Sequence, residues 1–255
     1  MNLRILTVSI LGLLSVSPMW AESYSSKESF HRSSAFEANG EVSLENINGD
    51  IDVRTWDKNE ILIEGEKSAK TDEELKRIDL VMEVSPARAM IRVKLPKRSG
   101  GMFSGNTIRA AVRFQITVPR NAVLSKISTV NSSVRIDGAS GSVHATSVNG
   151  GVKAEHLGGN AHLETVNGTV AATFDRIVPQ QKLSLESVNG RVNVKLPADA
   201  GVQFKASVVN GHVDCDFPIE SASTKRRKNL SGKIGDGRAS LEVTTVNGSV
   251  HIERS

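Results

Sequence analysis

The stretch LSLESVNGRVNVKL, residues 183–196, decides the fold class of this 255-residue chain. Apolar side chains alternate with polar ones on both sides of a central Asn189-Gly190 pair. A period of two is typical of β-strands that bury one face. Asn-Gly accepts the positive φ angles of tight turns, so the stretch predicts two strands joined by a sharp change of direction, with a positive φ at Gly190.

The same pattern recurs along the chain, which predicts a repeat protein. From Asn131 the asparagine steps forward by 18, 18, 22, 21 and 37 residues, and Asn48 precedes Asn131 by 83. The last interval therefore predicts an insertion. At Asn131 a serine, Ser132, follows in place of glycine and departs from the turn pattern. The predicted turn residues are Asn48, Gly49, Asn149, Gly150, Asn167, Gly168, Asn189, Gly190, Asn210, Gly211, Asn247 and Gly248.

Near-constant spacing and small inward residues, such as Ala145, Ala154 and Ala172, favour stacked coils with a narrow interior. We therefore predict an all-β fold, a β-helix-like solenoid stack of Val-Asn-Gly repeats, with stacked hairpins in a sandwich as the alternative. Burying one Val or Leu side chain contributes roughly 1.5–3 kcal/mol, and ordering the chain offsets most of it. Several repeats must therefore fold together.

The chain divides into four predicted regions. They are a signal peptide (1–21), a flexible polar segment (22–34), an N-terminal β-rich part (35–120) and the Val-Asn-Gly β-repeat stack (121–255). Within the third region, Thr71 followed by three acids and then two bases predicts one short helix over residues 71–77.

The first residues predict export. Arg4 precedes the apolar run 5–14, and a small residue, Ala21, stands at the expected cleavage site. The run is shorter than the roughly 20 residues that a membrane-spanning helix needs. The chain from Glu22 onward is therefore expected to be soluble, not membrane-spanning, and located in the periplasm or outside the cell.

The charge argues against a nucleic-acid-binding protein, and the cysteine content argues against a disulfide-stabilised one. After cleavage 31 basic residues stand against 28 acidic ones, a net charge of +3, which is too small to indicate a nucleic-acid partner. The lone cysteine, Cys215, excludes an internal disulfide. It occupies an inward position of the repeat, so we expect a buried, inert core residue.

Two segments carry a family resemblance. Residues 46–53, NINGDIDV, with Trp56-Asp57 after them, and residues 232–237, GKIGDG, followed by the strand 241–252, resemble the bacterial "putative adhesin" family of β-strand-repeat domains of unknown function. The resemblance implies an exported repeat fold without an established catalytic activity. It transfers no active-site residue.

The search for chemistry yields no catalytic residue, no cofactor site and no metal site. His144 and His162 occupy matching outward positions, which predicts a stacked pair without a ligand set around it. A polysaccharide-active β-helix enzyme would need a column of carboxylates. Glu164 and Glu186 recur at one outward position, but Glu45, which shares it, lies far away in the sequence.

The favoured function is a non-enzymatic binding or structural module of the cell envelope or surface, adhesin-like and without cofactor. Its partner would be an envelope polymer, an anionic surface, another envelope protein or a second copy of the chain. The alternatives are the polysaccharide-active enzyme and an envelope-stress or signalling accessory that acts through protein contacts. Two segments that break the repeat supply candidate sites: Lys225, Arg226, Arg227 and Lys228 for an anionic partner, and Met102 and Phe103 as a partner loop.

Overall fold

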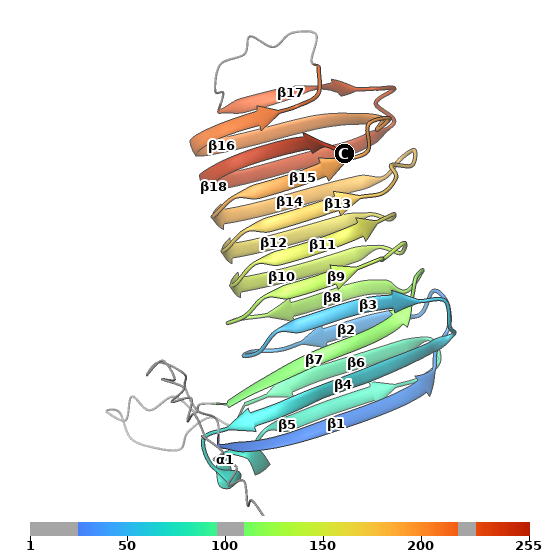
Figure 1. Cartoon of the computed structure of the whole chain (residues 1–255), viewed down its shortest axis with the longest axis vertical. Coiled ribbons are helices and arrows are strands. Elements are labelled where there is room, and N and C mark those ends of the chain that lie inside the picture. Colours follow the sequence, from blue (N-terminus) through green and yellow to red (C-terminus); the bar gives the residue numbers. More distant parts are fainter. Residues whose placement is uncertain (1–24, 96–109, 219–227) are drawn as a thin grey trace, which may run out of the picture.

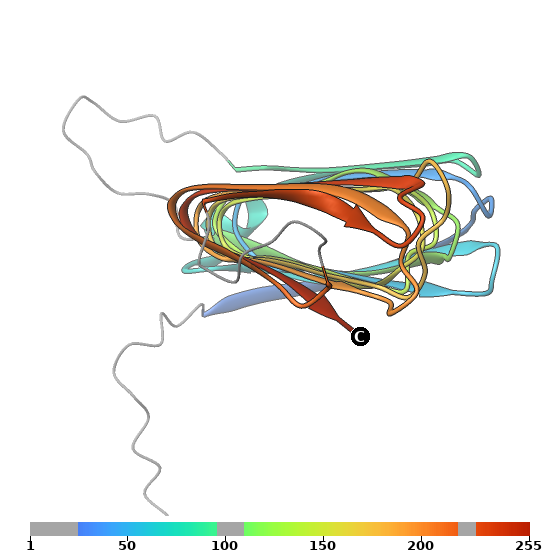
Figure 2. The same ribbon diagram turned by 90° about the horizontal axis from the view of Figure 1, so that it is seen from above.

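The structure is a computed structural model that describes residues 25–95, 110–218 and 228–255. Two layers of strands face each other and form a flattened solenoid, seen from the side in Figure 1 and along its axis in Figure 2. In the repeat region each rung contributes one strand to each layer. Side chains between the layers form one continuous core.

The first layer, called layer 1, contains the strand that precedes each Asn-Gly corner. Its strands stack in the order β5 (Asp79–Val84), β6 (Arg88–Lys94), β2 (Glu41–Glu45), β8 (Val123–Thr129), β10 (Val143–Asn149), β12 (Ala161–Asn167), β14 (Lys182–Asn189), the first part of β18 (Ala239–Arg254), the first part of β16 (Val202–Cys215) and β17 (Asn229–Ile234).

The second layer, called layer 2, contains the strand that follows each corner. Its order is β1 (Ser26–Ala35), β4 (Glu60–Ala69), β7 (Ala110–Pro119), β3 (Ile51–Trp56), β9 (Val134–Asp137), β11 (Val152–Leu157), β13 (Val170–Phe174), β15 (Val192–Leu196) and the second parts of β18 and β16.

The alternation of apolar residues places the core between the layers. Leu185 of β14 and Val192 and Val194 of β15 are fully buried, and the polar residues between them face outward. Neighbouring rungs pair in parallel, as β10, β12 and β14 do. Parallel neighbours cannot be hairpins. The predicted solenoid is therefore confirmed, and the alternative of stacked hairpins is wrong.

Antiparallel strands flank the parallel stack at both ends. β4 pairs antiparallel with β7 and with β1, β5 pairs antiparallel with β6, and β17 pairs antiparallel with β16. The short helix is α1 (Asp72–Lys76), whose N-cap Thr71 accepts a hydrogen bond from the Glu74 backbone at 3.2 Å, as the sequence predicted. The 82 residues between Asn48 and Asn131 thus include most of this end of the stack, and β8–β9 lies directly on β2–β3.

The polar segment 22–34 was predicted to be flexible, and for the residues described this is wrong. From Ser26 onward it forms β1, which pairs with β4 along its whole length. Opposite charges meet across the pair, as in Lys27–Glu66 at 3.0 Å, and Phe30 packs on Phe114 with ring centroids 5.5 Å apart. The partners that order β1 lie in other strands, so local composition does not indicate them.

The C-terminal strand breaks the sequential order of the stack. β18 lies between the β14–β15 rung and β16, although β16 precedes it in the sequence. Figure 1 shows β18 between β15 and β16. The 37-residue interval from Asn210 to Asn247 therefore contains β17 and the return of the chain to β18, which occupies the position between the β14–β15 rung and β16.

The corner glycines are required by close approach of neighbouring rungs. Of the six, Gly49 and Gly211 have positive φ, at 112° and 150°, but Gly190 does not, so its predicted positive-φ turn is wrong. A Cβ at any of the six would lie 1.6–2.3 Å from a carbonyl oxygen of an adjacent rung. A real Cβ does not fit at such distances, which excludes every side chain at these positions.

Candidate functional site

The seven repeat asparagines form one continuous ladder on the outer corner of the solenoid. Their spatial order is Asn48, Asn131, Asn149, Asn167, Asn189, Asn247 and Asn210, and each Nδ2 after the first donates to the Oδ1 of the preceding asparagine in this order at 2.8–2.9 Å. Asn131 joins this ladder although Ser132 replaces its glycine. Because these amides bond one another, the ladder is a structural feature.

A column of buried hydroxyl groups supports the ladder from inside, and it was missed in the sequence. Thr165 donates to the carbonyl oxygen of Gly150 at 2.6 Å, and Ser187 donates to that of Gly168 at 3.0 Å. These bonds satisfy buried polar groups at the corner. The available signal was a Ser or Thr two residues before the asparagine, at Thr129, Ser147, Thr165, Ser187 and Thr245.

The valine directly before the asparagine points outward. Val130, Val148, Val188 and Val209 are between 37% and 57% exposed. The Val-Asn-Gly motif therefore contributes its glycine to backbone contact, its asparagine to the ladder and its valine to the surface.

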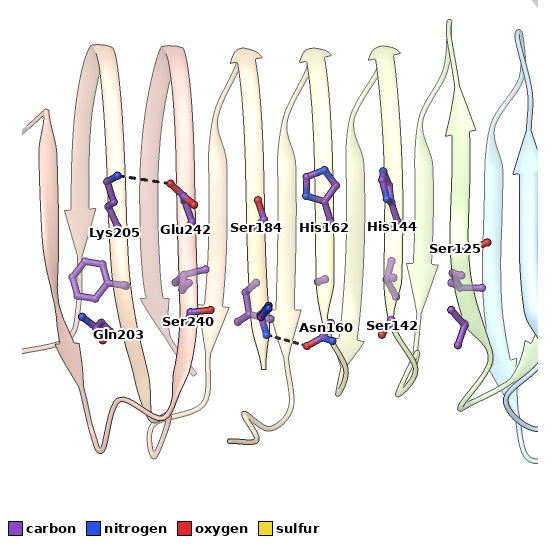
Figure 3. Close-up of a pocket in the computed structure, with 18 of the residues that line it drawn as sticks. Ser125, Ser142, His144, Asn160, His162, Ser184, Gln203, Lys205, Ser240 and Glu242 are labelled. Atoms are coloured by element: carbon purple, nitrogen blue, oxygen red, sulfur yellow. Dashed lines mark hydrogen bonds and ion pairs between the residues drawn. The ribbon is translucent and has the colours of Figure 1, made fainter. Parts of the chain in front are cut away.

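The candidate site is a groove of about 850 Å³ on the outside of layer 1, here called the layer 1 groove. It crosses the beginnings of β8, β10, β12, β14, β18 and β16, and so runs perpendicular to the strands. Figure 3 shows its outward side chains in two rows. One row contains Lys205, Glu242, Ser184, His162 and His144, and the other contains Gln203, Ser240, Asn160 and Ser142.

His144 and His162 stack on neighbouring rungs, as their matching positions predicted. Their ring centroids lie 4.6 Å apart in an edge-to-face arrangement. Burial, and then the nearby His162, lower the pKa of His144. The lowered pKa favours the neutral imidazole of His144, which both donates and accepts a hydrogen bond.

The rest of the groove also presents polar groups. Lys205 and Glu242 lie 3.9 Å apart at its β16 end, and Asn160 Oδ1 accepts from the Lys182 backbone at 2.9 Å. Serine hydroxyls occupy the positions between. Such a surface suits a ligand with many hydroxyl or amide groups.

Two sequence candidates lie outside the described residues: the loop with Met102 and Phe103, and three of the four cations, Lys225, Arg226 and Arg227. Lys228 is described, and its carbonyl oxygen accepts from the Val208 backbone at 2.7 Å.

The structure separates the three glutamates of the enzyme alternative. Glu164 and Glu186 are register neighbours on β12 and β14. Glu45 instead lies 2.9 Å from Arg92 and 3.2 Å from Lys126. The hydrogen bond from Arg92 outweighs partial burial and lowers the pKa of Glu45.

Cys215 lies in register with Ile252 and packs against the core, but it is only half-buried. Burial raises the pKa of its thiol. A thiol with a raised pKa holds little of the reactive thiolate at neutral pH.

Sequence reasoning missed one further cluster, His212, Asp214 and His251. The signal was present, since His212 and Asp214 stand two and four residues after Asn210, and His251 stands four after Asn247. The sequence does not show that the strands with these residues, β16 and β18, are neighbours, and only this adjacency brings the three side chains together.

The solenoid, the asparagine ladder and the groove define the class of this protein as a two-layer β-solenoid repeat protein. The chain belongs to the family described as Toastrack DUF4097, whose model matches residues 121–253, just over half of the sequence. This confirms the repeat family that the sequence resembled.

One solved structure shares the fold, and a second matches less closely. A protein from Clostridium sporogenes named a putative cell adhesion protein is 17% identical and matches with a TM-score of 0.50 over 89% of this chain and 100% of its own. A putative adhesin from Bacteroides fragilis is 12% identical, with a TM-score of 0.39 over 89% and 98%. A comparison with curated proteins finds no match. Among the described residues no helix is long and apolar enough to cross a membrane.

Proposed function

We propose that the chain is an exported, non-enzymatic binding module of the cell envelope, and that its layer 1 groove holds an extended polysaccharide. The observation that carries this proposal is the groove itself, which crosses six parallel strands and presents hydroxyl, amide, imidazole and charged side chains beside apolar residues. Six strands spaced by about 4.8 Å span roughly 24 Å, the length of several sugar units.

The repeat geometry supports a repetitive ligand. His144 and His162, or Ser240 and Gln203, present polar groups at equal positions on successive rungs. A polymer that advances by a similar distance per unit meets a polar side chain at each step. The adhesion name of the Clostridium sporogenes protein agrees with a binding role.

The test is to measure, by titration calorimetry, the binding of soluble envelope polysaccharides to the protein. Ser184→Trp places a bulky ring in the middle of the groove and should weaken binding at least tenfold. Ala171→Trp is the matched control, since Ala171 faces outward from β13 on layer 2. Equal affinity of both variants would contradict the groove as the binding site.

The polysaccharide-active enzyme remains the second candidate, because Glu164 and Glu186 stand side by side in register next to the groove. The same polymers, incubated with the protein and sized by chromatography, distinguish the two. A module that only binds leaves the polymer length unchanged, whereas an enzyme shortens it and loses this activity in Glu164→Gln.

Export is part of the proposal and rests on Arg4, the apolar run 5–14 and Ala21. Mass spectrometry of the extracytoplasmic fraction should find an amino terminus at or near Glu22. An intact Met1 on a cytoplasmic protein would contradict it.

A further inference from the structure

A second polar cluster lies on layer 2, on the other face of the solenoid from the groove. β16 and β18 are adjacent and parallel there, with His212 opposite Ser249 and Asp214 opposite His251. Residues two apart in a strand point to the same side. His212, Asp214 and His251 therefore face outward together, although 37 residues separate equivalent positions of the two strands.

The two imidazoles converge on one carboxylate oxygen. His212 Nε2 lies 3.1 Å from Asp214 Oδ2, and His251 Nδ1 lies 3.4 Å from the same oxygen. One ligand atom from each of the three residues lies within 4.8 Å of the others. Zn²⁺ binds nitrogen and oxygen at about 2.0–2.2 Å, so two ligands of a tetrahedral site stand about 3.3 Å apart. The distances from His212 Nε2 and from His251 Nδ1 to Asp214 Oδ2 are already close to this value.

The surroundings orient the cluster. Ser249 Oγ lies 3.1 Å from His251 Nε2, which leaves Nδ1 of that ring directed at Asp214. A hydrogen bond to the second ring nitrogen is the usual outer-shell support of a metal-bound histidine. The side chains of His212, Asp214 and His251 are 29%, 46% and 31% exposed, so an ion can reach them from solvent.

The next strand adds an unpaired acceptor. Asn193 of β15 lies in register with His251, and its Oδ1 is buried without a hydrogen-bond partner among the described residues. A buried carbonyl oxygen without a donor is costly. A cation, or a water bound to it, would supply the missing partner.

We propose that His212, Asp214 and His251 bind a divalent transition-metal ion of the zinc class, with water completing its coordination. Two nitrogen ligands and one carboxylate are a common donor set for Zn²⁺. The ion joins β16 to β18 and so fastens the rung at this end of the stack. A plain ion pair between the histidines and Asp214 is the competing account of the geometry.

The test is calorimetric titration of the tag-free chain from Glu22 onward with Zn²⁺. The wild type should bind one ion per chain. Asp214→Asn and His251→Gln should each lower the affinity at least tenfold, whereas the double variant His144→Gln, His162→Gln should bind like the wild type. Circular dichroism should show the same strand content in all four proteins, since every substituted side chain is partly exposed.

Co²⁺ provides an independent readout of the ligand set. The wild type should give the intense visible absorption of four-coordinate Co²⁺, and His251→Gln should lose it. The proposal is overturned if the wild type takes up no ion, if Asp214→Asn and His251→Gln bind as the wild type does, or if the His144 and His162 variant abolishes binding. A plain ion pair predicts the first of these results.

Discussion

Asn247 donates a hydrogen bond from Nδ2 to Oδ1 of Asn189 across 2.8 Å, although 58 residues separate the two in the sequence. The same kind of bond links all the remaining neighbouring pairs of the ladder. The ladder therefore records the spatial order of the rungs, which differs from their order in the chain.

The first prediction concerns this ladder. Asn167 donates to Asn149 and accepts from Asn189. Asn167→Ala removes both bonds, and one bond contributes roughly 0.5–1.5 kcal/mol net, so the variant should lose about 1–3 kcal/mol of unfolding free energy. Thr169→Ala, two residues further on, is the control. Urea denaturation measures both, and equal stability of the two variants would show that the ladder contributes nothing.

The second prediction concerns the corner glycines. In Gly190→Val the new Cβ would meet the Gly168 carbonyl oxygen at 1.8 Å, so the rungs must move apart. Overpacking of this kind costs roughly 1–3 kcal/mol. Arg191→Val, at an exposed outward position, should stay within about 0.5 kcal/mol of the wild type. Similar melting shifts for the two variants would refute the close-approach explanation.

The third prediction concerns Cys215. Burial raises its pKa, so a bulky maleimide should label the native chain more slowly than the urea-unfolded chain at neutral pH. A thiol whose folded pKa is raised stabilises the fold below its unfolded pKa, and this contribution is lost as the pH rises through the folded pKa. Cys215→Ala should keep the fold and remove that alkaline loss. Rapid labelling of the native thiol would contradict a buried position.

The fourth prediction separates two histidines by NMR titration. A hydrogen bond to Asp137 raises the pKa of His156, and burial followed by the nearby His162 lowers that of His144. His156 therefore stabilises the fold at low pH and loses this contribution as the pH rises through its folded pKa. His144 stabilises it at high pH and loses the contribution as the pH falls. His162→Ala should move the His144 midpoint upward, and Asp137→Asn should move that of His156 downward. Coincident midpoints in the wild type would contradict both environments.

The fifth prediction rests on the sequence of Lys225, Arg226, Arg227 and Lys228. Four consecutive cations cannot alternate into a core, and each basic residue near an anionic surface contributes about 1 kcal/mol. The chain should therefore sediment with anionic vesicles at low salt and be released at higher salt, because exposed charges are screened over about 8 Å at physiological ionic strength. A variant with serine at all four positions should stay in the supernatant. Equal binding of the wild type and the serine variant to the vesicles would show that these cations do not contribute to binding of an anionic surface.

The sequence predicts the solenoid because its two signals are local. Alternation in residues 183–196 identifies the strands, and regular spacing of the asparagines identifies the stack. The strand β1 was not predicted because its order comes from other strands: it pairs with β4, with which it forms the Lys27–Glu66 ion pair, and its Phe30 packs on Phe114 of β7. Cross-strand partners of this kind cannot be read from composition.

The candidate sites divide in the same way. The His144 and His162 pair was predictable, since both residues hold one position in consecutive repeats. The His212, Asp214 and His251 cluster was not, because its two strands become neighbours only through the intercalation of β18. The reason for glycine at Gly190 was also hidden, because the atom that excludes a side chain belongs to Gly168 in another rung.

The place of β18 also constrains how the molecule is assembled. A repeat stack can in principle grow rung by rung behind the emerging chain, with each new coil adding to the last. Here β16 has no direct contact surface on β14 and β15, since β18 fills that position. Growth rung by rung along the chain is therefore interrupted after β15, because β16 reaches the stack only through its pairing with β18. The strand β18, although it follows β16 in the chain, is thus the strand that connects β16 to the sequential rungs.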